Sequence, residues 1–178
     1  MIKLMDLLTE AAQLSKYQIF APGTGGSSFK FNPEKVPTGK LKIGMFMACS
    51  NKPNGAFWTS SYKAKFKGSQ WTDYKKKYFK RWASGMGAVF EVQGSPKIAR
   101  VRNQRDYDKL VKKYQHDVTD MGCVFGDQYL NWYNLAKDYD GVQLATKTSI
   151  LGITEQWDVE STAWFNMKKL KFIGTTKV

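Results

Sequence analysis

Apolar residues at the start of the chain recur at helical spacing. They lie at Leu4, Leu7, Leu8, Ala11 and Leu14, with polar residues between them. Such spacing is typical of an amphipathic helix, which we expect over residues 1–16. The apolar face of this helix either docks on the domain's own core or inserts into a groove on a partner, and the pattern fits both.

Short stretches rich in aromatic and β-branched residues predict strands along the rest of the chain. The expected strands cover residues 17–20, 40–48, 55–59, 87–92, 97–101, 142–145, 157–165 and 170–173. Gly94, Ser95 and Pro96 separate the strands at 87–92 and 97–101, so we expect these two strands to form a hairpin.

Helical spacing also predicts three helices between these strands. The first has Thr72 as its N-cap, and its inward face carries Tyr74, Tyr78 and Trp82. The second starts at a capping box of Asn103 and Asp106, and its apolar face carries Tyr107, Leu110, Val111 and Tyr114. The third is marked by Leu130, Tyr133 and Ala136 and is expected to stop at Gly141. Strands and helices together predict a single α+β domain over residues 17–178.

The composition is typical of one domain in a reducing compartment. With 178 residues and 42% hydrophobic content, the chain can bury a core without disulfide or metal staples. Its longest apolar run, residues 43–49, is far shorter than the roughly 20 residues that a membrane span needs, so we expect no membrane partner. Two cysteines and one histidine cannot assemble a disulfide framework or a zinc site, so we expect no metal.

The net charge of +13, from 28 Lys and Arg against 15 Asp and Glu, is the largest deviation in composition. Such an excess favours binding to nucleic acid or to an acidic protein, although charge also serves solubility. The residues expected to contact phosphates are Lys63, Lys65, Lys67, Lys75, Lys76, Lys77, Lys80, Arg81, Arg102 and Arg105. Alternatively, the lysines of the first helix extend from a packed helix into solvent and bind nothing.

Two regions of the chain carry motifs that occur together in one known family. In the C-terminal region, "DYDG" at 138–141 precedes a strand, Glu160 begins another strand, and "FNMKKLK" at 165–171 follows it. In the central region, "GAFWTSSY" at 55–62 precedes a helix and then the strand "GAVFEV". This order resembles ADP-ribosyltransferases, mainly over residues 55–92 and 138–174.

The resemblance implies a fold, a cofactor and a site. The fold would consist of two small, mostly antiparallel sheets that form a split core with flanking helices. NAD would be the cofactor, its nicotinamide riboside held by Thr59, Ser60, Ser61 and Tyr62, with Glu160 as the catalytic acid. A carboxylate there can stabilise the oxocarbenium character that develops on the ribose, or hold the 2′-hydroxyl. The alternatives are a Glu160 that pairs with a surface lysine and hydroxyls that only cap a helix or turn.

Two features depart from the family pattern. The family places an Arg or His on an early strand to hold NAD, but no Arg precedes Arg81 here and the single His is His116. The usual spacing before Phe165 also places the acid at Ser161 rather than Glu160. One residue of slip turns a strand side chain to the opposite face, unless a bulge restores it.

Three functions therefore compete. The first is transfer of ADP-ribose from NAD to a nucleic acid or a nucleic-acid-associated protein. The second is a non-catalytic role on a degenerate transferase scaffold, in which the basic surface binds nucleic acid or a virion, because the basic surface and the opening segment also resemble tailed-bacteriophage proteins. The third is an RNA 2′-phosphotransferase, which uses the same general fold. The expected location is the host cytoplasm, or the virion for a phage structural protein.

Overall fold

The computed structural model describes residues 14–21, 32–44, 52–63, 68–79, 85–115, 130–145, 157 and 159–177. The strands are β1 (Tyr17–Phe20), β2 (Phe57–Ser61), β3 (Met86–Val92), β4 (Ile98–Val101), β5 (Gly141–Leu144), β6 (Ser161–Trp164) and β7 (Leu170–Lys177). The helices are α2 (Gln70–Tyr78), α3 (Gln104–Lys113) and α4 (Trp132–Asp138), with short 3-10 helices at Pro33–Lys35 and Met167–Lys169. The fold is therefore α+β, as the sequence pattern predicts. The expected N-terminal helix lies outside the described residues.

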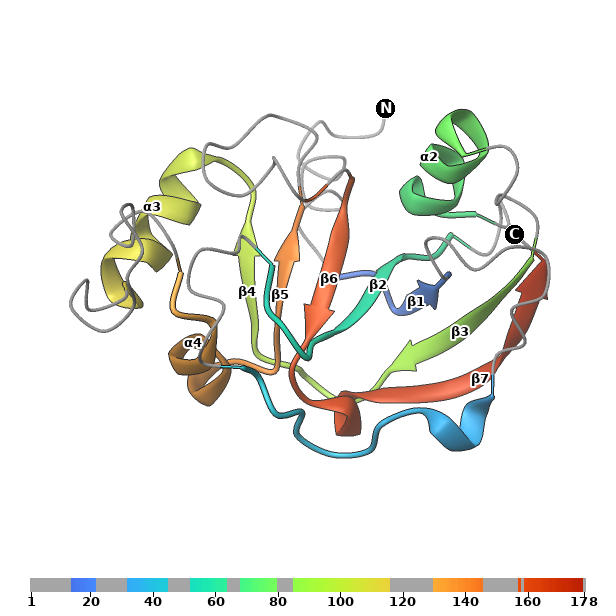
Figure 1. Cartoon of the computed structure of the whole chain (residues 1–178), viewed down its shortest axis with the longest axis horizontal. Helices are drawn as coiled ribbons and strands as arrows, with labels where there is room; N and C mark the ends of the chain where they lie inside the picture. Colours follow the sequence, from blue (N-terminus) through green and yellow to red (C-terminus); the bar gives the residue numbers. More distant parts are fainter. Residues whose placement is uncertain are drawn as a thin grey trace, which may run out of the picture.

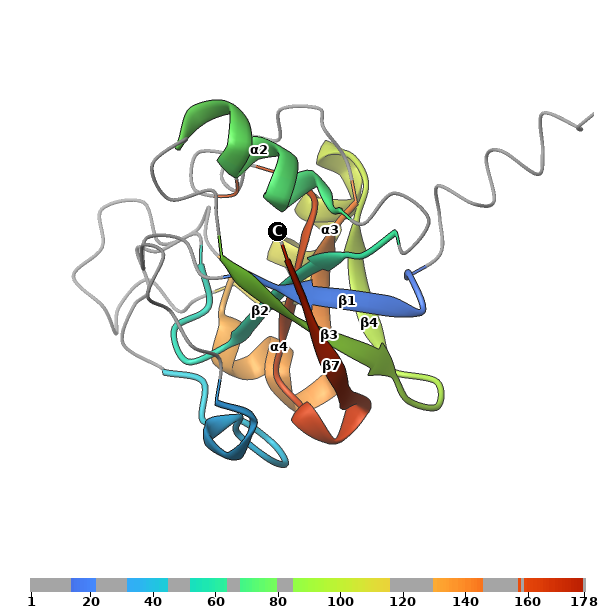
Figure 2. The same cartoon turned by 90° about the vertical axis from the view of Figure 1, so that its right-hand side faces the viewer.

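The strands follow one another in the order β4-β5-β6-β2-β1-β3-β7. Only β4 and β5 pair in parallel among the described strands. Strand β2 joins the two ends of the sheet, because its residues 57–59 pair with β6 and its residues 60–61 pair with β1. Figures 1 and 2 show that β4, β5 and β6 lie side by side along nearly the same axis, with β6 antiparallel to β5, and that β3 and β7 cross them steeply. The two expected sheets are not confirmed as separate, since β2 links all seven strands into one sheet.

Helices cover one face of this sheet. Tyr107 of α3 and Leu135 of α4 belong to the same buried cluster as Val101 of β4, Val142 of β5 and Phe165. At the other end, Trp71 of α2 packs against a small cluster on β1 and β3, and its Nε1 donates a hydrogen bond to the carbonyl of Ala21 at 2.8 Å. The side chains that alternate with these residues point to the opposite face.

The opposite face is lined by aromatic and polar side chains. Phe20 stacks on Phe57 with ring centroids 5.1 Å apart, and Phe57 meets Phe90 edge-on at 5.4 Å. Trp164, the register partner of Phe57, is fully buried on this face. Trp157 and Phe165 are also buried, but they belong to the cluster under α3 and α4. The opposite face holds the strand-borne polar residues that form the candidate site.

Two predicted strand features are wrong. Strands β3 and β4 do not form a hairpin, because β3 pairs with β1 and β7 whereas β4 pairs with β5. The turn around Gly94, which has a φ of 60°, instead carries the chain from one end of the sheet to the other. The same residue types occur in a hairpin turn and in a turn that leads to a distant strand, because turn residues do not determine which strand pairs next. The expected strand from residue 40 is reduced to an isolated bridge between Lys40 and Asn166 within the described part.

Helix α2 starts earlier than predicted. Its N-cap is Ser69, whose Oγ accepts a hydrogen bond from the Thr72 amide while the Thr72 Oγ1 accepts one from the Ser69 amide. This start buries Thr72 and Lys75 and leaves Tyr78 57% exposed. The expected inward position of Tyr78 and outward position of Lys75 are therefore both wrong.

The other two helices follow the predictions more closely. Asn103 caps α3 by accepting a hydrogen bond from the Asp106 amide, and Tyr107 is buried as expected. In α4 the buried residues are Trp132 and Leu135, whereas Tyr133 is exposed. Gly141 begins β5 instead of ending a helix, and a Cβ there would meet the carbonyl oxygen of Ala163 at 2.7 Å.

Candidate active site around Glu160

The Glu160 side chain lies at the centre of a buried polar cluster and is only 7% exposed. Its Oε2 accepts hydrogen bonds from the Ser61 amide at 3.0 Å and from the Ser60 Oγ at 3.1 Å. Its Oε1 accepts hydrogen bonds from the Ser61 Oγ at 2.9 Å and from the Gln143 Nε2 at 3.0 Å. The fold therefore brings together Glu160 and the Ser60–Ser61 pair, as the sequence analysis expects.

Strand register explains this meeting. In the antiparallel β2–β6 pair Thr59 lies opposite Thr162, so continuing the register places Ser61 opposite Glu160. At this point β2 leaves β6 and pairs with β1, which brings the Ser60 hydroxyl within reach of the carboxylate. Ser161 stands outside the cluster, because its Oγ donates a hydrogen bond to the carbonyl of Val159 at 3.1 Å. The acid of this cluster is Glu160, despite the family spacing that favours position 161.

The four hydrogen bonds to Glu160 all come from neutral donors. They occupy the roughly four acceptor positions of a carboxylate, an arrangement that suits its ionised form. No salt bridge to Glu160 occurs among the described residues. The buried carboxylate is thus held in place by neutral groups, and the described part of the chain gives no ion pair between Glu160 and a surface lysine.

Two of the four residues expected to bind the cofactor lie elsewhere. The Thr59 Oγ1 donates a hydrogen bond to the Gln18 Oε1 and accepts one from the Trp164 Nε1, both at 2.8 Å. Its hydroxyl is therefore part of the core. Tyr62 packs against the cluster of β1 and β3 that α2 covers. Neither side chain is a partner of Glu160.

Gln143 is the member of the cluster that the sequence analysis missed. It stands between Val142 and Leu144 in a strand whose four residues are all buried. A single long polar residue in such a strand was the available signal, because buried polar groups need partners. Its Nε2 binds Glu160, but its Oε1 has no partner, and neither has the buried Oγ1 of Thr162 on the adjacent strand.

Nine of the ten residues expected to contact phosphates divide into three groups. Lys63, Lys76, Lys77 and Arg105 are exposed. Lys75 is buried, only 4% exposed, and burial lowers the pKa of its ammonium group, so its expected place on a phosphate-binding surface is wrong. Lys65, Lys67, Lys80 and Arg81 lie outside the described residues.

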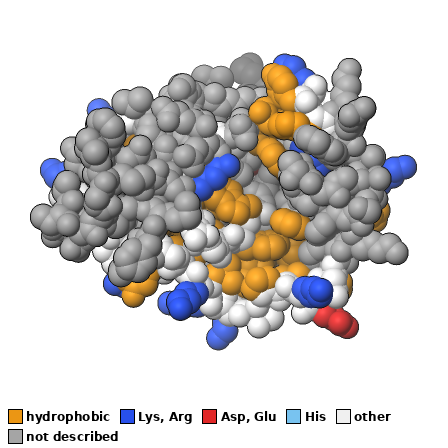
Figure 3. Space-filling view, in the orientation of Figure 1, with side chains coloured by type: hydrophobic (Ala, Val, Ile, Leu, Met, Phe, Trp, Pro, Cys, Tyr) orange, Lys and Arg blue, Asp and Glu red, His pale blue; other side chains and the backbone are white. Residues whose placement is uncertain are grey.

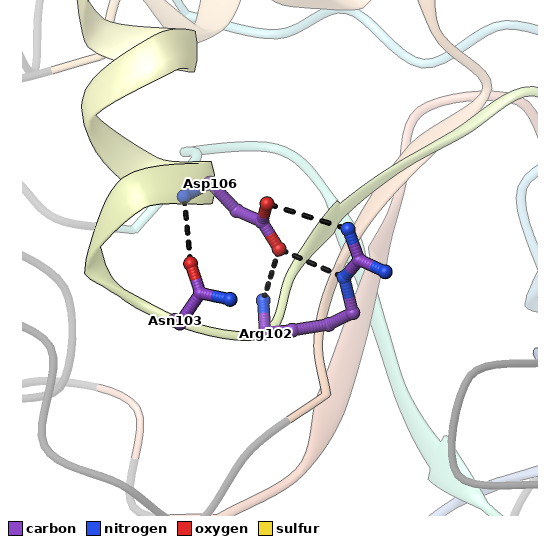
Figure 4. Close-up of polar contacts among 3 residues, drawn as sticks. All are labelled: Arg102, Asn103 and Asp106. Atoms are coloured by element: carbon purple, nitrogen blue, oxygen red, sulfur yellow. Dashed lines mark hydrogen bonds and ion pairs between the residues drawn. The ribbon is translucent and has the colours of Figure 1, made fainter. Parts of the chain in front are cut away.

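Arg102, the remaining member of that set, is tied to the start of α3. Its Nε donates to the Asp106 Oδ2 at 2.8 Å, and the same oxygen accepts the Arg102 amide at 3.1 Å (Figure 4). Hydrogen bonding to Arg102 holds the pKa of the Asp106 carboxyl below its usual range. Much of the Arg102 charge is therefore already compensated within the protein.

Within the described residues, no group of three or more His, Cys, Asp or Glu side chains could hold a metal ion. No helix of that part of the chain is long and apolar enough to span a membrane. None of the family models, curated proteins and solved structures compared with the chain matches it.

Proposed function

We propose that this chain is an ADP-ribosyltransferase-like protein that transfers ADP-ribose from NAD to a nucleic acid or a nucleic-acid-associated protein. One observation carries the proposal: a buried carboxylate, Glu160, is held by neutral donors and makes no salt bridge among the described residues. Such a carboxylate is available to attract a positive charge that develops on a substrate. Neutral hydrogen bonds from two strands fix its position without cancelling that charge.

The reaction would place the nicotinamide ribose against Glu160. When the bond from the ribose C1′ to the nicotinamide nitrogen breaks, the electron pair leaves with nicotinamide and positive charge develops on the ribose. The nearby carboxylate lowers the energy of that state, and burial strengthens the attraction. A nucleophile on the acceptor then donates an electron pair to C1′ and loses its proton.

The hydrogen-bond pattern favours an electrostatic role over a grip on the 2′-hydroxyl. The Oε1 of Glu160 already accepts two hydrogen bonds, and its Oε2 accepts one from the Ser61 amide and shares the single Ser60 hydroxyl proton with the main-chain carbonyl of Glu160. A ribose hydroxyl could bond to Glu160 only by replacing one of these donors, whereas charge attraction needs no free acceptor position. Ser60, Ser61 and Gln143 are then positioning residues that hold the carboxylate.

The test is NAD cleavage by the Glu160→Gln variant, measured as release of nicotinamide. Loss of a charge that stabilises the transition state should reduce cleavage by about a hundredfold or more. NAD affinity, measured by calorimetry, should change little. The matched control is Ser161→Ala, which alters the neighbouring side chain outside the cluster and should retain activity.

Thermal unfolding of both variants checks that they fold. If Glu160→Gln unfolds, Ser61→Ala provides the second measurement, because three donors still hold the carboxylate and only its placement changes. No cleavage by the unaltered chain, or equal cleavage by the chain and a folded Glu160→Gln variant, would contradict the proposal.

A second candidate function, binding of nucleic acid without catalysis, is favoured by the exposed face of α2. Lys76, Lys77 and Tyr78 are exposed there, and the Lys77 Nζ lies 4.8 Å from the centroid of the Tyr78 ring. Tyr78 also contacts Tyr74, with ring centroids 4.7 Å apart. Figure 3 shows hydrophobic side chains and a cationic group together over this helix. Aromatic rings beside lysines suit stacked bases and their phosphates.

Salt dependence tests this candidate. Binding of a short single strand and a random duplex should fall steeply between about 50 and 200 mM salt, by about a thousandfold for roughly six phosphate contacts. Neutralising Lys76 and Lys77 together should reduce the slope of log affinity against log salt by about two. The matched control neutralises Lys168 and Lys171, which are exposed in the last 3-10 helix and at the start of β7. A flat salt response would remove nucleic acid from the possible partners.

A further inference from the structure

Arg100 lies in the same row of side chains as the polar residues next to Glu160. In the parallel β4–β5 pair Arg100 is the register partner of Gln143, and Gln143 is in turn the partner of Thr162 on β6. Paired residues of adjacent strands point to the same face. The flanking residues Ala99 and Val101 belong to the core under the helices. Arg100 therefore projects from the same face of the sheet as Gln143 and Glu160.

Two buried oxygen atoms in this row have no hydrogen-bond partner. Gln143 is 3% exposed and its Oε1 accepts no hydrogen bond within the described part of the chain, and the same holds for the Oγ1 of Thr162, which is fully buried. Buried polar atoms without partners destabilise a fold by about 1–3 kcal/mol each, so they are rare in native proteins. A ligand that donates a hydrogen bond to Gln143 would satisfy one of them.

The guanidinium of Arg100 is also without a partner of opposite charge. It is half-buried, and no salt bridge to it occurs within the described part of the chain. Burial, and to a lesser extent repulsion from Arg102, lowers the pKa of Arg100. Both effects show that its charge is partly removed from water and not compensated, in contrast to that of Arg102.

We propose that Arg100 and Gln143 form a binding position for a phosphate-bearing ligand that reaches Glu160. The planar guanidinium offers a pair of donors that matches two phosphate oxygens. The Gln143 Oε1 supplies an acceptor for a hydroxyl of the same ligand. A phosphorylated sugar carries both groups, which makes a nucleotide unit the ligand class that this pair fits.

The identity of the ligand rests on the proposed function, which offers two sources for such a unit. One is the pyrophosphate of NAD, and the other is the backbone of a nucleic acid acceptor. Neighbouring strands lie about 4.8 Å apart, so Arg100 is roughly 10 Å from β6 along the sheet. That spacing lets one ligand contact both Arg100 and the region of Glu160. The site therefore supplies a cation on β4 where the family pattern expects one on an early strand.

The experiment measures the affinity of the full chain for three probes by calorimetry: inorganic pyrophosphate, NAD and a short single-stranded oligonucleotide. The Arg100→Gln variant should lose about ten- to a hundredfold in affinity for pyrophosphate and for one of the other two probes. Arg100→Lys keeps the charge but not the paired donors, and should lose less. The control is Arg102→Gln, which removes the same charge two residues along the strand. The Arg102 guanidinium is already bound to Asp106, so its loss should not affect the proposed site.

The outcomes separate the sources and the proposals. A selective loss of NAD affinity assigns Arg100 to the donor, and a selective loss of oligonucleotide affinity assigns it to the acceptor. Equal affinities of the unaltered chain, Arg100→Gln and Arg102→Gln for all three probes overturn the proposal, as does failure of the unaltered chain to bind any of them. The unaltered chain could also bind pyrophosphate through Arg100 without cleaving NAD. That result would support the binding site and refute the proposed activity.

Thermal unfolding distinguishes a binding role from a structural one. Arg100 makes no salt bridge within the described residues, so Arg100→Gln should melt at the same temperature as the unaltered chain or higher. A large decrease would mean that the guanidinium holds the fold together, and the proposal would then be wrong. The binding of Arg100→Lys provides the second measurement if the Gln variant does not fold.

Discussion

Thr59 and Thr162 form a matched pair for measuring what a buried hydroxyl contributes to this fold. They are register partners on β2 and β6, and both are buried. The Thr59 Oγ1 makes two hydrogen bonds of 2.8 Å, to Gln18 and Trp164, whereas the Thr162 Oγ1 makes none. Replacing each threonine by valine exchanges a hydroxyl for a methyl group of similar shape. The two substitutions therefore differ mainly in the hydrogen bonds that they remove.

The expected changes in the free energy of unfolding have different magnitudes and can have different signs. Thr59→Val leaves the Trp164 Nε1 and the Gln18 Oε1 without this partner, at about 1–3 kcal/mol each, so the loss should be about 2–6 kcal/mol. That is a large part of the roughly 5–15 kcal/mol that stabilises a typical domain. Thr162→Val removes an unpartnered polar atom and adds apolar contact, so it should be neutral or stabilise by up to about 1 kcal/mol.

Urea unfolding of the two variants and the unaltered chain measures this difference. Equal dependence on urea concentration in all three would show that the change lies in the folded state. The variants should differ by about 2 kcal/mol or more. If both lose the same stability, or if Thr162→Val loses more, the hydrogen-bond assignment on this face of the sheet is wrong. If Thr59→Val is as stable as the unaltered chain, the Thr59 hydroxyl is not needed in the core and is again a candidate for cofactor binding.

Three further substitutions test the core, the β5 packing and the start of α3. Phe165→Ala removes a ring that is 2% exposed and should lower the free energy of unfolding by about 3–5 kcal/mol, measured by urea unfolding. Gly141→Ala places a Cβ against the carbonyl oxygen of Ala163 at 2.7 Å and should lower the melting temperature, with a loss of about 1–3 kcal/mol. Arg102 lowers the pKa of Asp106 in the folded chain. The ionised carboxyl therefore stabilises the fold fully at pH values above its unfolded pKa near 3.9. This stabilisation is lost as the pH falls through the lower pKa of the folded state. Asp106→Asn should therefore lose about 0.5–1 kcal/mol at pH 7, and its deficit should fade in acid.

Local structure was largely predictable from the sequence, but strand partners were not. β1 matches its predicted range of 17–20, and the Asn103 cap of α3 follows from side-chain chemistry within a few residues. The predicted hairpin at Gly94 failed because turn residues specify a change of direction without specifying which strand the chain joins next. The inward face of α2 was predicted wrongly because Trp71, which precedes the predicted start, packs against the small cluster on β1 and β3, and Thr72 and Lys75 are buried on that side.

In the candidate site, too, the residues of the local motifs were predicted, whereas the residues placed there by strand pairing were not. Glu160 and the Ser60–Ser61 pair were predicted from family resemblance, and the structure places them in contact. Thr59 was predicted with them because it is adjacent in sequence, but its hydroxyl bonds to Gln18 and Trp164 in the core. Gln143 and Arg100 were not predicted as site residues, because their positions depend on how β4, β5 and β6 pair.

The positions of the two charged side chains on this face of the sheet do not maximise the stability of the fold. Glu160 is buried with neutral partners, and Arg100 is half-buried without a salt bridge among the described residues. Two desolvated charges of opposite sign would lower the free energy of the fold most by pairing with each other, yet Gln143 stands between them in the strand order and binds only Glu160. A desolvated charge without an opposite charge beside it stabilises the folded chain less than a paired one. A ligand with a positive centre near Glu160 and a negative group near Arg100 would compensate both, and this is the charge distribution that NAD acquires as its nicotinamide bond breaks.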